Sequence, residues 1–145
     1  MDEFEFLNKE EILRVEEAIA DAETFTSGEI RVHIDEYCDN DLMGKAAKRF
    51  EELEMDMTEL RNGVLFYIAY KDRKFAIIGD SGINEKVPEG FWDSVRETLE
   101  ENFKKGDFST GLCEGIKICG KKLSELFPFQ EGDINELPNE VTFGK

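Results

Sequence analysis

The most apolar stretch of this chain is Val64-Leu65-Phe66-Tyr67-Ile68-Ala69-Tyr70. A continuous β-prone run of this length predicts a central strand that is covered on both faces. A short polar tip follows, and then a second run from Lys74 to Ile78, which predicts an antiparallel hairpin. The fold is therefore expected to contain a sheet with the first of these strands in its interior.

The segment before the hairpin predicts a parallel neighbour for the central strand. In residues 29–37 apolar and polar side chains alternate, with Ile30, Val32 and Ile34 on one face, which is typical of a half-buried strand. A helix beginning after Asp41 connects this strand to the central one. Since a strand–helix–strand crossover joins parallel strands, these two strands should run in the same direction.

Three more helices are expected, over residues 8–23, after Pro88, and from Asp107 to about residue 126. Three glycines lie inside the last helix, where each costs about 1 kcal/mol relative to alanine, so they indicate close backbone packing. We predict an α/β fold, a three-layer α/β/α sandwich around a small mixed β-sheet. Residues 1–127 would form the domain, and residues 128–145 an irregular or extended C-terminal tail packed on it.

The composition excludes several classes of function. The 145 residues include 34 acidic and 18 basic side chains, which gives a formal net charge of −16. A nucleic-acid-binding protein needs a basic surface, and an anionic membrane would repel this chain. The charge favours cations and basic partners, although it also fits a role in solubility alone.

The remaining sequence features point to a cytoplasmic monomer. The three cysteines are an odd number with no CxxC pair, which is typical of reduced thiols rather than a disulfide framework. The N-terminus is acidic and lacks a signal peptide, and no apolar run is long enough to span a membrane. The high charge and the absence of a heptad seam favour a monomer.

Three loop segments should meet at one edge of the sheet. Thr26-Ser27-Gly28-Glu29 and Arg61-Asn62-Gly63 each open a strand, and Gly79-Asp80-Ser81-Gly82 closes one. Since the first two strands are parallel and the third returns antiparallel, these three ends share an edge.

This edge would collect oxygen donors. Glu29, Asn62 and Asp80 lie in the three segments, and Asp107 would join them if the last helix packs alongside. Carboxylate and amide oxygens are the ligands that hard divalent cations prefer. The glycines of the same segments also fit the simpler interpretation that they are turn residues only.

Five stretches, in this order and spanning about residues 8–127, give the chain a resemblance to a known family. They are Thr26-Ser27-Gly28-Glu29-Ile30, Arg61-Asn62-Gly63-Val64-Leu65, Gly79-Asp80-x-Gly82-Ile83, Phe91-Trp92 and Phe103-x-x-Gly106-Asp107-Phe108-x-x-Gly111. The chain resembles the TPM domain, an α/β module named after a thylakoid lumen protein, a photosystem II repair protein and a nematode receptor modulator.

The resemblance implies an α/β/α sandwich and divalent-cation binding, of calcium in particular. Magnesium is a second candidate for the same oxygen ligands. Asn62, Asp80 and Asp107 match the loop motifs of the family, whereas Glu29 is added from the topology alone. Many relatives have an acidic residue where this chain has Arg61. Many also carry an export signal and a membrane helix or glycine-rich tail, which this sequence lacks.

Three functions are consistent with these observations. The first is a divalent-cation-binding module with a regulatory or scaffolding use. The second is a metal-assisted acid phosphatase, an activity described for a plant member, with Arg61 holding the phosphate. The third is a protein-interaction domain that binds through its acidic surface or its tail, without metal or catalysis. No residue is assigned a catalytic role beyond this phosphate contact.

Overall fold

The computed structural model describes residues 6–129 and 139–144. Its sheet has four strands in the order β3-β2-β1-β4, which are β1 (Glu29–Asp35), β2 (Gly63–Ala69), β3 (Lys74–Gly79) and β4 (Thr142–Phe143). β1 pairs in parallel with β2, with Glu29 opposite Gly63, and β3 is antiparallel to β2. The apolar run around Phe66 therefore forms an interior strand, as predicted.

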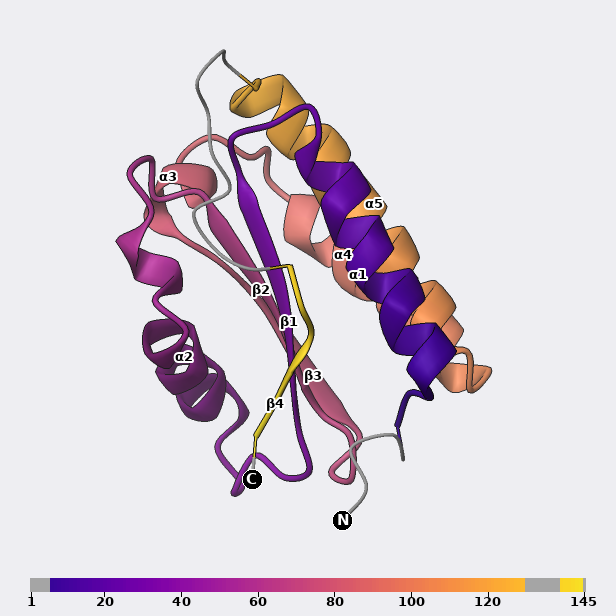
Figure 1. The fold of residues 1–145 in the computed structure, drawn as a ribbon. Helices are drawn as coiled ribbons and strands as arrows, with labels where there is room; N and C mark the ends of the chain where they lie inside the picture. Colours follow the sequence, from indigo (N-terminus) through magenta and orange to yellow (C-terminus); the bar gives the residue numbers. More distant parts are fainter. Residues whose placement is uncertain (1–5, 130–138, 145) are drawn as a thin grey trace.

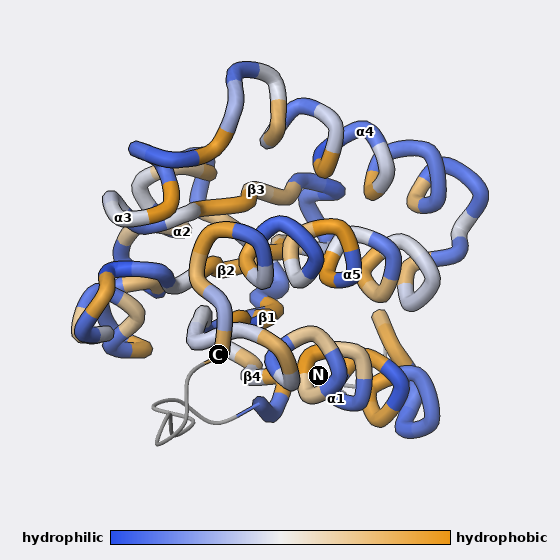
Figure 2. Tube along the Cα trace, turned by 90° about the horizontal axis from the view of Figure 1, so that it is seen from above, coloured by the Kyte–Doolittle hydropathy of each residue, from blue (hydrophilic) through white to orange (hydrophobic). Residues whose placement is uncertain are grey.

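Helices cover both faces of this sheet (Figure 1). One face carries α1 (Lys9–Glu23), α4 (Phe91–Lys104) and α5 (Phe108–Leu126), and the other carries α2 (Leu42–Glu52) and the 3-10 turn η1 (Met55–Met57). The predicted three-layer sandwich around a mixed sheet is confirmed. Figure 2 shows the apolar residues of the sheet in the middle of the molecule, between the helices.

The two faces of the sheet belong to two hydrophobic cores. Residues such as Ile30 and Phe66 pack under the three-helix layer, and residues such as Leu65 and Tyr67 pack under α2. The prediction that the first strand is half-buried is wrong, because all seven residues of β1 are buried. Of its polar side chains, His33 and Asp35 pair with each other, and Asp35 also accepts a hydrogen bond from Arg49 of α2.

Local signals in the sequence account for the helix ends and their packing. Asn8 and Glu11 form the predicted capping box at the start of α1. The glycines of α5 allow close approach, as expected. A Cβ atom added to Gly115 would collide with Leu99, and one added to Gly120 would lie 2.6 Å from the Cβ of Ala22.

Two short elements were not predicted. A single-turn helix, α3 (Ser81–Asn84), follows β3 inside the segment expected to be a loop. In the tail, Thr142 and Phe143 pair in parallel with His33 and Ile34, so β4 extends the sheet beyond β1. Residues 130–138 of the predicted tail lie outside the described residues. Across the described parts of the chain, no helix is both long enough and apolar enough to cross a bilayer.

Candidate functional site

The three loop segments meet at the edge of the sheet where β1 and β2 begin and β3 ends. The backbone N–H of Glu29 donates to the carbonyl oxygen of Asn62 at 3.3 Å, and that of Asp80 donates to Gly63 at 3.0 Å. The N–H of Gly82 donates to the carbonyl of Arg61 at 2.9 Å. We call this group of residues 26–30, 60–64 and 79–84 the loop edge.

Asp80 is held at the loop edge by Arg61. Arg61 Nε lies 2.7 Å from Asp80 Oδ2, and Nη2 lies 2.9 Å from Oδ1, which also accepts the N–H of Ser81 at 2.7 Å. The hydrogen bonds and charge of Asp80 raise the pKa of Arg61. The carboxylate is 7% exposed, whereas the side chain of Arg61 is 51% exposed. The cation is therefore the outer member of the pair.

Asn62 presents a buried oxygen without a partner. The residue is 1% exposed, its N–H donates to Thr58 Oγ1 at 3.2 Å, and its Nδ2 donates to Ser27 Oγ at 3.4 Å. Its Oδ1 has no hydrogen-bond partner. An unmet buried polar atom costs about 1–3 kcal/mol, so native proteins retain few of them without a reason.

Glu29 is engaged by a residue that the sequence analysis did not identify, Glu23 at the end of α1. Glu29 is 2% exposed, and Glu23 accepts the N–H of Ile30 at 2.7 Å. Burial, and then the charge of Glu29 and a hydrogen bond to it, raise the pKa of Glu23 to about 8, against the lowering effect of the Ile30 N–H. Nothing in the sequence distinguishes Glu23 from the exposed acidic residues of α1, and only the turn from α1 into β1 brings the two carboxyl groups together.

Asp107 does not reach the loop edge, which corrects the predicted approach. Trp92 in the first turn of α4 packs against Gly79 at the loop edge. α4 then runs for 14 residues, or about 21 Å, toward the other end of the sheet. There Gly106 and Phe108 lie beside Tyr70 of the β2–β3 hairpin. The helix that precedes Asp107 therefore carries it the length of the sheet away from Asp80.

A second polar cluster lies on the α2 face of the sheet, with Asp35 at its centre. Asp35 accepts from Arg49 Nε at 3.0 Å and from the hydroxyl of Tyr67 at 2.7 Å, and it lies 2.9 Å from His33 Nε2. Burial alone would raise the pKa of Asp35, but these hydrogen bonds hold it well below its usual range. The other ring nitrogen of His33 bonds Thr142 in β4 at 2.6 Å. This cluster is a paired network that joins β1, β2 and α2 to Thr142 of β4.

The chemistry of the loop edge suits a hard cation only in part. Its donors are the carboxylate of Asp80, the amide oxygen of Asn62 and the carboxyl group of Glu29, which are the correct atom types. Residues 6–129 and 139–144 contain no group of three or more His, Cys, Asp or Glu side chains placed to hold a metal ion. An ion here would need water and backbone oxygens to complete its coordination.

Comparisons with known proteins place the chain among related folds. It is similar to the BA42 protein from the psychrophilic bacterium Bizionia argentinensis, with 45% identity, 99% of each chain covered and a TM-score of 0.91. It shares its fold with the N-terminal domain of the cg2496 protein from Corynebacterium glutamicum, at 13% identity and a TM-score of 0.66, covering 90% of this chain and 81% of that one. Comparison with curated proteins returned no match. The family model of the TPM domain matches residues 1–122, so the chain belongs to the TPM domain family.

Proposed function

We propose that this protein is a TPM-type module that binds a divalent cation, calcium in preference to magnesium, at the loop edge. The observation that carries the proposal is the buried Oδ1 of Asn62, which has no hydrogen-bond partner. It lies in the segment that also supplies Arg61, beside the loop of Asp80. A cation bound between the two loops would be coordinated by this oxygen and by the carboxylate of Asp80.

Arg61 competes with a bound cation for the carboxylate of Asp80. Both oxygens of Asp80 are engaged by the guanidinium, so an ion can use this carboxylate only when Arg61 turns toward solvent. That movement is open to Arg61, because its side chain is 51% exposed, whereas the carboxylate of Asp80 stays buried. With few charged ligands and a resident competitor, we expect a dissociation constant of about 10⁻⁴–10⁻³ M, as in weak extracellular calcium modules.

The arrangement favours a binding module over the phosphatase alternative. Arg61, the residue expected to hold a phosphate, directs Nε and Nη2 to Asp80. A module of this kind would have a regulatory or scaffolding use, in which the cation fixes the relative positions of the three loops.

A calcium titration followed by amide NMR tests the proposal, with magnesium as the comparison. We expect saturable shifts confined to residues 26–30, 60–64 and 79–84, and none at residues 106–108. Asp80→Asn should abolish the shifts, while Asp107→Asn serves as the control and leaves them unchanged. Shifts spread along the acidic helices in proportion to charge, with no saturation, would show counterion condensation and overturn the proposal.

A further inference from the structure

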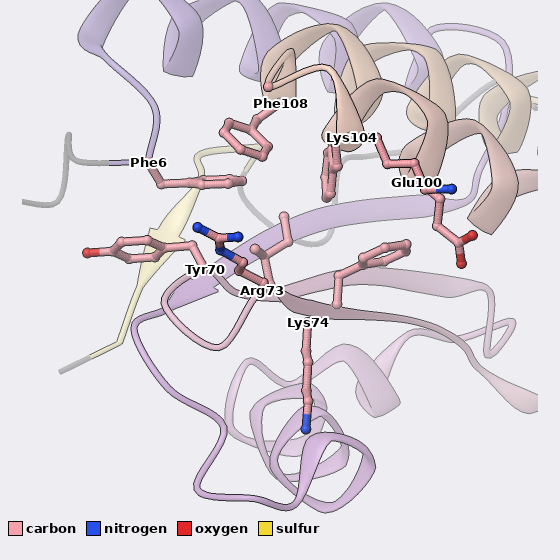
Figure 3. Close-up of a pocket in the computed structure, with 11 residues that line it drawn as sticks. Phe6, Tyr70, Arg73, Lys74, Glu100, Lys104 and Phe108 are labelled. Carbon is pink, nitrogen blue, oxygen red and sulfur yellow. The ribbon is translucent and has the colours of Figure 1, made fainter.

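A second candidate site lies at the opposite end of the sheet, away from the loop edge. A cavity of about 550 Å³ opens between the tip of the β2–β3 hairpin, the segment before α1 and the turn between α4 and α5 (Figure 3). Its volume falls in the range of small-molecule pockets, about 300–1,000 Å³. We call it the hairpin cavity.

Aromatic rings from four separate segments form the walls of the hairpin cavity. Phe6 stacks on Tyr70 with ring centroids 5.6 Å apart and lies 4.5 Å from the ring of Phe108. Phe103 packs edge-on against Phe75 and Phe108, each at 5.3 Å. All five rings are partly exposed, so they present apolar surface to the cavity rather than filling it.

The described residues that line the hairpin cavity carry a net positive charge, the reverse of the charge of the whole protein. Arg73 and Lys104 line it, and in the part of the chain that the structure describes neither forms an ion pair with a carboxylate. Glu100 also lines it, next to Lys104 on α4, and the ammonium group of Lys74 is directed away (Figure 3). In a chain with 34 acidic and 18 basic residues, two unpaired cations at one aromatic cavity create a local site for an anion.

The backbone of Arg73 supports a role for its side chain. Arg73 has a φ of 55° in the hairpin turn, the left-handed conformation that glycine or asparagine usually occupies there. Such a conformation costs other residues about 1–2 kcal/mol, and strained residues are often retained where the side chain has a use. Figure 3 shows the guanidinium on the side of the cavity formed by Phe6 and Tyr70.

We propose that the hairpin cavity binds a small amphipathic anion, a soluble molecule with a flat aromatic or aliphatic body and one carboxylate or sulfonate group. The body would lie among the rings of Phe6, Phe103 and Phe108, where stacking and edge contacts stabilise it. The anionic group would lie at the mouth, within reach of Arg73, whose planar guanidinium suits carboxylate and sulfonate oxygens. This site does not depend on cation binding at the loop edge.

The first test is a fluorescence titration with anilinonaphthalene sulfonate, paired with its uncharged analogue phenylnaphthylamine. We expect the sulfonate to bind about ten times more tightly than the analogue, because a charge-assisted hydrogen bond is lost in the analogue. Dodecanoate should displace the dye. Amide NMR with the same dye should place its shifts at residues 68–75 and 103–108. Equal binding of dye and analogue, or shifts at the separate hollow between α1 and α5 around Ala22 and Ile118, would overturn the proposal.

The second test separates binding from stability. Arg73→Gly removes the cation and relieves the left-handed strain, so we expect dye affinity to fall about tenfold while the melting temperature stays the same or rises. Lys48→Gln is the matched control, since it removes an exposed cation from α2 on the other face of the sheet and should leave dye affinity unchanged. Wild-type dye affinity in Arg73→Gly would refute the assignment of the anion to this residue.

Discussion

Arg61 and Asp80 form a bidentate ion pair that closes the loop edge, with N–O distances of 2.7 and 2.9 Å. The pair joins the start of β2 to the end of β3 and occupies both oxygens of the carboxylate that a cation would need. Without metal, the guanidinium of Arg61 therefore occupies the proposed metal site. On this proposal, Arg61 would set the metal affinity together with the ligands.

Removal of Arg61 should strengthen calcium binding. In Arg61→Ala the carboxylate of Asp80 loses the guanidinium and keeps the N–H of Ser81 as a donor. Alanine tolerates the φ of 51° at this position no better than arginine, so the backbone cost is matched. We expect calcium affinity to rise about three- to tenfold in isothermal titration calorimetry. Arg96→Ala, on the surface of α4, is the control. Unchanged affinity in Arg61→Ala would show that the ion does not use Asp80.

Asn62→Leu should abolish calcium binding without unfolding the protein. Leucine has a similar volume and removes an amide oxygen that is unsatisfied, together with one weak bond of 3.4 Å to Ser27. Among the described residues the only side-chain partner of the amide is Ser27, which is partly exposed, so the change leaves no buried polar group there without a hydrogen bond. We therefore expect the free energy of unfolding to change by less than about 1 kcal/mol. Thermal unfolding with and without calcium measures both effects. A large loss of stability in the absence of calcium would mean that Asn62 is a structural residue.

The free energy of unfolding should depend on pH through Glu23. Its pKa rises from 4.5 to about 8 on folding, so the folded state binds a proton that the unfolded state releases above pH 4.5. The stabilisation is complete below pH 4.5 and is lost as the pH rises from 4.5 through 8, with a slope of up to about 1.4 kcal/mol per pH unit. Urea unfolding of the wild type and of Glu23→Gln at pH 5.5 and at pH 8.5 isolates this term.

Glutamine cannot ionise but retains an oxygen for the N–H of Ile30. We therefore expect Glu23→Gln to gain stability relative to the wild type as the pH rises. Carboxylates that do not contact Glu23 titrate alike in both proteins and cancel, so the difference reports on the pair of Glu23 and Glu29. Parallel pH profiles of the two proteins would contradict the shared burial of Glu23 and Glu29.

Gly82→Ala should disrupt the loop edge. A Cβ at this position would collide with the carbonyl oxygen of Leu60 and lie 2.6 Å from that of Arg61, and neither backbone can yield easily. We expect a loss of about 1–3 kcal/mol in the free energy of unfolding, together with weaker calcium binding. Ser81→Ala, an exposed change in the same turn, is the control and should be nearly neutral. A fully stable Gly82→Ala protein would show that the contact between these loops is not tight.

The sequence was sufficient to predict the architecture and the meeting of the three loops. The long apolar run around Phe66 determines the interior strand, and the crossover through α2 determines which strand ends lie together. Both arguments depend on chain direction and periodicity, which a single sequence displays. The capping box at Asn8 and the close packing of Gly120 were also predictable, because they follow from residue type.

The positions of individual side chains were harder to predict from the sequence. Asp107 was placed at the wrong end because its position depends on the length and direction of α4, and no local motif reports where a helix ends relative to a sheet. Glu23 and the network of Asp35 depend on contacts between distant segments. The ion pair between Arg61 and Asp80 could have been anticipated, since both residues had been placed at one edge with opposite charges.

The pairing of β4 with β1 has a consequence for the newly made chain. His33 and Thr142 are 109 residues apart, yet they bond side by side in the sheet. During translation, the outer edge of β1 therefore stays unpaired until β4 emerges, after β2, β3 and the helices have been made. An open strand edge is a template for pairing with another chain. Nascent chains that stall before residue 142 should thus be the most prone to associate with one another. The short strand β4 prevents this by covering the open edge of β1.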